Sequence, residues 1–214
     1  VIEGTPQRII SLAPSNTEIL YALGLEDRVV AVTDYCDYPP ETVDKPTVGG
    51  FSTVNIEKVI AMNPDLILAA PANTEEIIDR LRSLGLTVVT LDPQAIEDVL
   101  HEIELLGRVT GNEAEASALV GELRARIDAV AAGTGNLTER PSVAHVIWYD
   151  PLWVSGRDTF QDEVITLAGG INAFGSLEGW SIVSLEEFIT TNPDYILVSS
   201  GSGMDRDEYD AIYN

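Results

Sequence analysis

Two stretches of this chain are nearly the same: "FSTVNIEKVIAMNPDLIL" at Phe51–Leu68 and "WSIVSLEEFITTNPDYIL" at Trp180–Leu197. Each begins with an aromatic residue, carries a glutamate six positions later and reaches Asn-Pro-Asp six positions after that. A proline stops a helix before it, and the apolar run after the aspartate is typical of a buried strand. The repeat therefore predicts one helix-to-strand junction in each of two similar lobes. A junction accounts for Asn-Pro-Asp, but it does not account for the matching aromatic residue and glutamate.

The residues around the first copy alternate between strand and helix patterns. Apolar strands are predicted at 8–13, 28–33, 65–70 and 86–91. Ser15 and Glu18 fit a capping box at the start of a helix that ends near Gly24, while Asn55 and Asn73 are predicted to cap two further helices. Alternation of this kind predicts an α/β fold with a mostly parallel sheet.

The middle of the chain has a helical pattern from about residue 95 to 132, with one break at Thr110-Gly111-Asn112. The part after the break is long enough for a rigid connecting helix of about 30 Å. We therefore expect an N-terminal lobe at 1–94, a helical connector at 95–135 and a C-terminal lobe at 136–214. Because ligands favour interfaces between lobes, we expect the ligand cleft there.

The charge of the chain is strongly acidic, with 35 Asp and Glu against 12 Lys and Arg and a net charge of -23. This charge disfavours non-specific binding to nucleic acid, whose phosphates would be repelled. Acids spread over patterned segments, with almost no lysine, are typical of a protein from a high-salt organism. No apolar run approaches the length that spans a bilayer, and no leader pattern opens the chain, so we expect a cytoplasmic protein or a mature form.

Catalytic and metal-binding patterns are weak in this sequence. Cys36 is the single cysteine, which excludes an internal disulfide, and the two histidines, His101 and His145, fall within a helical and a strand pattern. Two histidines so placed do not predict a zinc site, and the Ser199–Gly203 stretch lacks a nucleophile elbow. The sequence therefore predicts a protein that is not an enzyme and that uses no metal and no cofactor.

Aromatic residues at strand ends and in loops are the stronger signal. Several aromatic side chains among Gly and Pro favour a platform for a broad, partly apolar ligand. Ordinary core packing is the competing interpretation, and for Trp148 the two interpretations are equally supported. The residues concerned are Tyr35, Tyr38, Phe51, Trp148, Tyr149, Trp153 and Trp180.

Six segments together resemble a known family, the substrate-binding proteins of ABC importers for cobalamin and ferric siderophores. They are "RIISLAPSNTEILYALGLEDRVVAVTDYCDYPP", the two Asn-Pro-Asp junctions, "DPLWVSG", "TFQDEVITLAGGINAF" and "GWSIVSLEEF". The resemblance implies two α/β lobes joined by one long backbone helix, in a monomeric extracytoplasmic protein that a lost leader can anchor to lipid. The Tyr-Cys-Asp-Tyr-Pro-Pro stretch, with the repeated aromatic and glutamate, is most similar to the cobalamin branch.

The same resemblance implies roles for particular residues. Tyr35, Phe51, Trp153 and Trp180 would line a corrin pocket. Glu57 and Glu186 would meet arginines of the permease dimer, although an acid in a first helical turn also has a simple role at the helix dipole. The family continues past the last strand with further elements, whereas this sequence ends at Asn214, so we expect an incomplete C-terminal lobe.

Three alternatives stay open at this point. A siderophore or haem carrier of the same fold is the nearest, although anionic siderophores call for arginines and only Arg157 lies near the predicted rim. A hydrolase has no assembled set of catalytic residues in its favour. A protein-interaction domain without a small ligand would leave the aromatic loops unexplained.

Overall fold

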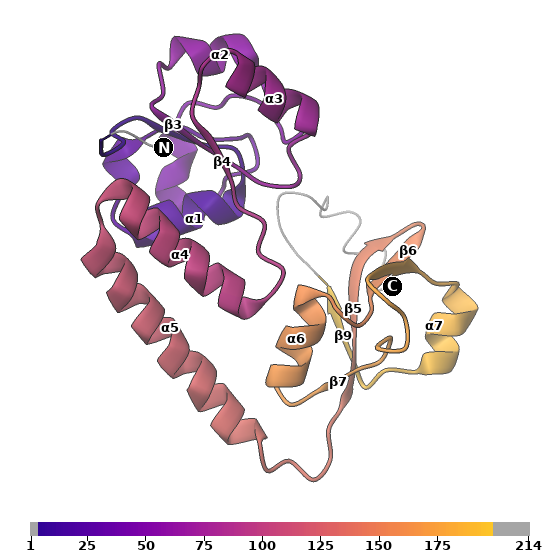
Figure 1. Cartoon of the computed structure of the whole chain (residues 1–214). Helices are drawn as coiled ribbons and strands as arrows, with labels where there is room; N and C mark the ends of the chain where they lie inside the picture. The colour runs from indigo at the N-terminus through magenta and orange to yellow at the C-terminus, as the bar shows by residue number, and fades with distance from the viewer. Residues whose placement is uncertain (1–3, 199–214) are drawn as a thin grey trace. The chain divides into compact units, whose positions relative to one another are not determined.

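The computed structural model describes residues 4–198 of the chain (Figure 1). The chain divides into two compact units. Unit 1 comprises Val1–Pro93 and Leu100–Gly121, and unit 2 comprises Gln94–Val99 and Glu122–Asn214. The chain is therefore an α/β protein of two units.

Unit 1 is built on a four-stranded parallel sheet in the order β2-β1-β3-β4. The strands are short and the central ones are fully buried, so helices on the sheet exclude water from them. The elements are β1 (Ile9–Ser11), α1 (Pro14–Ala22), η1 (Glu26–Arg28), β2 (Val29–Ala31), η2 (Pro40–Asp44), α2 (Ile56–Ala61), β3 (Leu66–Ala69), α3 (Glu75–Ser83) and β4 (Val88–Thr90). This sheet matches the predicted parallel arrangement.

Two of the predicted helix caps in unit 1 are wrong. Helix α1 begins at Pro14, after Ala13, and Ser15 lies inside its first turn with no capping bond at the helix start. Proline suits this position because its ring fixes φ and the amide that it lacks needs no partner there. Helix α3 is capped by Thr74, whose hydroxyl accepts from the amide of Ile77, and not by Asn73. Asn55 caps α2 as predicted.

Two helices follow unit 1's sheet, α4 (Ile96–Thr110) and α5 (Glu113–Thr134), with the break between them at the predicted place. Gly111 has a φ of 73°, which allows the sharp turn, and Asn112 donates to the carbonyl of Leu23. Gly107 of α4 lies directly against Ala116 of α5, where an added Cβ would overlap the alanine's own Cβ. This close approach fixes how the first part of α5 packs on α4.

Unit 2 contains a mixed sheet in place of the mostly parallel one expected. Strand β5 pairs in parallel with β7 and β9 and antiparallel with β6, which pairs antiparallel with β8. The reason is local, since only Asp150 and Pro151 separate β5 from β6, and so short a connection forms a hairpin. The elements are β5 (Ser142–Tyr149), β6 (Leu152–Ser155), α6 (Phe160–Leu167), β7 (Ile171–Asn172), β8 (Trp180–Ile182), α7 (Leu185–Thr191) and β9 (Tyr195–Val198).

The core of unit 2 lies on one face of this sheet. Val146, Val154 and Val183 are buried there with Phe174, whose ring stacks on that of Phe188 from α7 at a centroid distance of 5.4 Å. The opposite face is free of this cluster and presents the aromatic residues described below.

A change at Gly107 tests the packing of the two central helices. We expect Gly107→Ala to lower the free energy of unfolding by about 1–3 kcal/mol, because the new methyl group forces α4 and α5 apart. Gly121→Ala, in α5, is the control because no atom lies within 4 Å of its added Cβ. That control should be neutral or stabilising by up to about 1 kcal/mol. Urea unfolding of both variants decides the point, and equal stability of the two would contradict it.

Candidate functional site

Three tryptophans, which are all the tryptophans of the chain, gather on one face of the unit 2 sheet. Trp148 of β5 pairs with Trp153 of β6, and Trp180 of β8 pairs with Ser155, two residues further along β6. Residues opposite one another, and residues two apart on a strand, share a face of a sheet. With Ile147 the three rings line an apolar hollow of about 520 Å³. We call these four residues the tryptophan surface.

An irregularity in β5 builds this surface. The register of β5 against β6 shifts between Val146 and Trp148. In a regular strand Trp148 would follow Val146 onto the core face, because residues two apart point the same way. The extra residue of a bulge reverses that alternation, so Ile147 and Trp148 both line the hollow. The indole of Trp148 is held by donation to the carbonyl of Asp150 at 2.9 Å.

His145 supports the tryptophan surface from within the strand. Its ring meets that of Trp180 edge to face, with centroids 6.1 Å apart, and only 8% of the residue is exposed. Burial lowers the pKa of His145, because the charged imidazolium loses its hydration. The neutral form is therefore the one that this arrangement favours at neutral pH.

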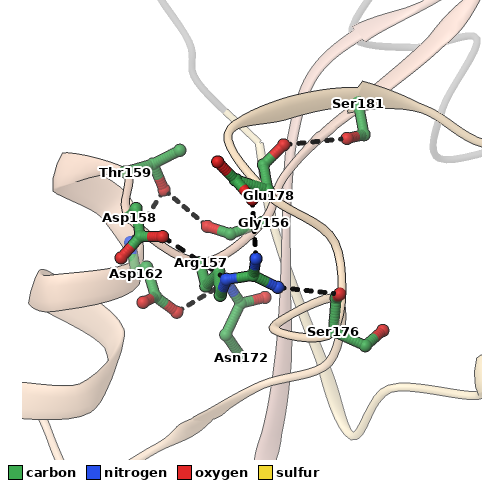
Figure 2. Close-up of polar contacts among 9 residues, drawn as sticks. All are labelled: Gly156, Arg157, Asp158, Thr159, Asp162, Asn172, Ser176, Glu178 and Ser181. Carbon is green, nitrogen blue, oxygen red and sulfur yellow. Dashed lines mark hydrogen bonds and ion pairs between the residues drawn. The ribbon is translucent and has the colours of Figure 1, made fainter.

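A polar network joins the start of β8 to the end of β6, and Figure 2 shows its side chains. The guanidinium of Arg157 donates to Glu178 at 2.7 Å and to the carbonyl of Ser176 at 3.2 Å, and its Nε lies 3.4 Å from a carboxylate oxygen of Asp158. At Gly156 an added Cβ would overlap the carbonyl of Leu177, so only glycine allows the two segments to approach this closely.

In unit 1, Tyr35 and Phe51 form a parallel stack. The ring centroids are 4.5 Å apart and the planes differ by 5°. A stack of this kind covers one face of each ring, so a ligand can contact only the outer ring faces and the edges. Tyr35 follows β2 and Phe51 precedes α2. The backbone amide of Asp34 donates to the backbone carbonyl of Gly49 at 3.0 Å, which holds the two segments together.

Asn73 fixes the position of Phe51. The side chain is buried, donates to the carbonyls of Phe51 and Leu12, and accepts from the amide of Ala70. Leu12 and Ala70 directly follow β1 and β3, so one amide group ties the aromatic loop to two strand ends. This is the role of Asn73 in place of the predicted cap.

The two predicted docking glutamates occupy equivalent places. Glu57 lies in the first turn of α2, after the cap Asn55, and Glu186 lies in the first turn of α7, after the cap Ser184. Both side chains are exposed. The structure thus places an exposed carboxylate at the same position of the same helix in each unit.

The structure brings the predicted ligand residues together in two groups, Tyr35 with Phe51 in unit 1 and Trp153 with Trp180 in unit 2. Sequence reasoning left Trp148 undecided, and the bulge that places it was not visible as a pattern. A second hollow, of about 670 Å³, is lined by Tyr21 and Tyr38. Tyr38 belongs to the aromatic residues predicted for a ligand platform, but none of the four residues that the resemblance implies for the pocket lies here. The Ser199–Gly203 stretch lies outside the described residues.

Within residues 4–198, no cluster of three or more His, Cys, Asp or Glu side chains is arranged to hold a metal ion. Over the same part of the chain, no helix is both long enough and apolar enough to cross a membrane. Cys36 is a buried free thiol beside the hydroxyls of Thr17 and Thr33.

Comparison with known proteins identifies the family. The model of the periplasmic binding proteins matches residues 9–211. The chain belongs to this family. A Bacillus subtilis relative described as an uncharacterised ABC transporter substrate-binding lipoprotein is 37% identical, over 94% of this chain and 66% of its own length, just under two thirds.

Two solved structures of periplasmic binding proteins are also similar. The vitamin B12-binding protein of Vibrio cholerae has a TM-score of 0.80 and 32% identity, over 91% of this chain and 77% of that one. A heme-binding protein from Roseiflexus sp. RS-1 has a TM-score of 0.82 and 29% identity, over 91% and 76%. The family consists of substrate-binding transport proteins and not of enzymes, and its members bind their ligands as cargo for transport. Family and lipoprotein relative together indicate an extracytoplasmic location.

The buried histidine of this periplasmic binding protein predicts a pH effect on unit 2. Because burial lowers the folded pKa of His145 below the unfolded value of 6.5, the unfolded chain takes up a proton first as the pH falls. The contribution of His145 to the free energy of unfolding should be fully present above pH 6.5. Below that pH the free energy of unfolding should fall, by at most about 1.4 kcal/mol per pH unit.

His145→Leu removes this titration, so its unfolding free energy should change less between pH 7 and pH 5 than that of the parent, whatever its absolute stability. Tryptophan fluorescence during urea unfolding is the measurement, because all three tryptophans are in unit 2. Equal pH slopes for parent and variant would show that the histidine has no such effect.

Proposed function

We propose that this periplasmic binding protein captures cobalamin or a related corrinoid and delivers it to the permease of an ABC importer. The observation that carries the proposal is the tryptophan surface, a broad apolar hollow walled by three indole rings and Ile147. A corrin is a large ring whose edge and faces match such a surface, and aromatic side chains supply much binding energy per residue. Unit 1 has an aromatic pair of its own, the stacked rings of Tyr35 and Phe51.

A haem or siderophore carrier is the second candidate, since the structural relative from Roseiflexus binds heme and has the same fold. Aromatic rings stack on any flat macrocycle, so the tryptophan surface alone suits haem as well. The state of Arg157 favours the corrinoid, because its guanidinium is already held by Glu178 and Asp158. Carboxylates of haem or the anionic groups of a siderophore would have to compete with these partners.

Further details of the proposal follow from the same chain. We infer a monomer outside the cytoplasm that a leader can anchor to lipid, because the Bacillus subtilis relative is described as a lipoprotein. The net charge of -23 suits a high-salt surrounding. Glu57 and Glu186 dock onto arginines of the permease dimer, because a two-fold partner requires the same contact from each unit. Arginine binds a carboxylate in a bidentate, charge-assisted geometry, which makes each contact specific.

Removing one indole tests the ligand and its site together. We expect Trp180→Ala to weaken cyanocobalamin binding about three- to tenfold, because stacking on one ring contributes about 0.5–1.5 kcal/mol beyond its buried area. Titration calorimetry is the measurement, since it does not depend on the lost fluorophore. Tyr195→Ala is the matched control: Tyr195 is an exposed aromatic residue of β9 that pairs with Val143, about five residues of strand from Trp148. Unchanged affinity in Trp180→Ala would move the site elsewhere, and no binding by the parent would refute the corrinoid proposal.

The two docking glutamates are tested as a pair. Glu57→Ala with Glu186→Ala should leave cyanocobalamin affinity within about twofold and reduce stimulation of a reconstituted cobalamin permease at least tenfold. The cost in folding stability should be about 1 kcal/mol or less per site, because only a helix-dipole interaction is lost. The control pair is Glu76→Ala with Glu187→Ala, which removes the same charge from first helical turns. Equal stimulation of the permease by both double variants would show that Glu57 and Glu186 have no special role in docking and only interact with the helix dipole.

A further inference from the structure

The polar network of Figure 2 includes residues that follow β6 and precede β8, the two strands that carry Trp153 and Trp180. Trp180 pairs with Ser155, and two residues before Trp180 stands Glu178 while two residues after Ser155 stands Arg157. Arg157 and Glu178 themselves form an isolated bridge. Two residues of chain reach at most about 7 Å, so Arg157 and Glu178 are anchored close to the tryptophan surface, although neither lines the hollow.

The charges of this group do not cancel. The single guanidinium of Arg157 contacts the carboxylates of both Glu178 and Asp158, so these three side chains carry one net negative charge, and the carboxylate of Asp162 in the same network adds a second. The guanidinium also donates to the carbonyl of Ser176, so several of its N–H groups are already used. A ligand carboxylate that approached Arg157 would meet an occupied donor and two anions.

Fastening the β8 segment is not the main role of the ion pair. Three backbone hydrogen bonds already join the segment after β6 to the segment before β8. The amide of Gly156 donates to the carbonyl of Gly179 and the amide of Arg157 to the carbonyl of Leu177, each at 2.8 Å. The amide of Gly179 donates to the carbonyl of Arg157 at 2.9 Å. The Glu178 side chain is 74% exposed, and pairs as exposed as this contribute little to stability. The loop should therefore keep its place, and Trp180 its position, without the carboxylate of Glu178.

We propose that Glu178 is a specificity-determining residue: it occupies Arg157 and keeps the border of the tryptophan surface negative, so that the protein accepts macrocycles with uncharged amide side chains and rejects those with carboxylates. This inference rests on the proposed function and deepens it, because it explains how one aromatic surface distinguishes ligands with similar rings. Freed from Glu178, the guanidinium of Arg157 becomes a donor for a ligand carboxylate at the same border.

The experiment compares two probes with the same corrin ring, cyanocobalamin and dicyanocobyrinic acid, whose side chains are carboxylates. Calorimetry gives the ratio of their affinities for the parent, for Glu178→Gln and for Arg157→Gln with Glu178→Gln. The control is Glu139→Gln, which removes the same charge before the start of β5, about 20 Å of strand from Trp148. Hemin, an iron porphyrin with carboxylate side chains, serves as a third probe.

Glu178→Gln should bind cyanocobalamin as the parent does, within about twofold, and bind dicyanocobyrinic acid and hemin about three- to tenfold more tightly, as expected for a change of one to two charges at such distances. The double variant should lose that gain, because it has no guanidinium, and Glu139→Gln should show none. The parent's preference for cyanocobalamin should also narrow at high salt, which screens the repulsion.

An unchanged ratio in Glu178→Gln would overturn the inference, as would an equal loss for both corrins, which would mean that Glu178 acts by positioning Trp180. Either result leaves the corrinoid function standing if the parent binds cyanocobalamin. A parent that does not bind cyanocobalamin refutes the proposed function, and this inference with it.

Discussion

One carboxylate in each unit holds the repeated junction together. Asp65, the last residue of the first Asn-Pro-Asp, accepts from the amides of Gln7 and Arg8, which lead into β1. Asp194, at the matching position, accepts from the amide and hydroxyl of Ser142 at the start of β5, and these bonds lower its pKa. In both units the aspartate thus joins the end of a helix to the strand beside the one it precedes. This contact aligns the two neighbouring strands in each sheet, and the loops that carry the aromatic residues are connected to these sheets.

The preceding asparagine makes the contact possible. Asn63 and Asn192 both adopt the left-handed conformation, with φ of 47° and 46°. Asparagine tolerates this conformation better than most residues, and the following proline cannot continue the helix. The chain therefore turns at once from α2 to β3, and from α7 to β9, and sets each aspartate against its neighbouring strand. The need for this turn accounts for Asn-Pro-Asp. The aromatic residue and the glutamate at the other end of each helix are the ones that we propose for the ligand and the permease.

Sequence patterns were reliable where a single local rule decides the structure. Strand and helix periods located the elements, and Asn55 caps α2 as its position predicts. The errors arose where another preference or a tertiary contact was stronger. Helix α1 begins at Pro14, one residue before Ser15, which was expected to cap it. Asn73 does not cap α3, because its side chain donates to the carbonyl of Phe51. Trp148 could not be placed at all, because the period of two assigns it to the core and only the bulge beside Val146 turns it outward.

The scarcity of basic residues shapes the chemistry of the surface as a whole. In unit 1 the bonds of Arg8, Arg28 and Lys45 run to backbone carbonyls, so these cations secure chain segments. In unit 2, Arg124 pairs with Glu97 and Arg157 with Glu178. With 35 acidic and 12 basic residues, many carboxylates compete with a ligand for each basic side chain. A chain of this composition would recognise a ligand most readily through rings and apolar area, and the three indole rings and Ile147 of the tryptophan surface supply both.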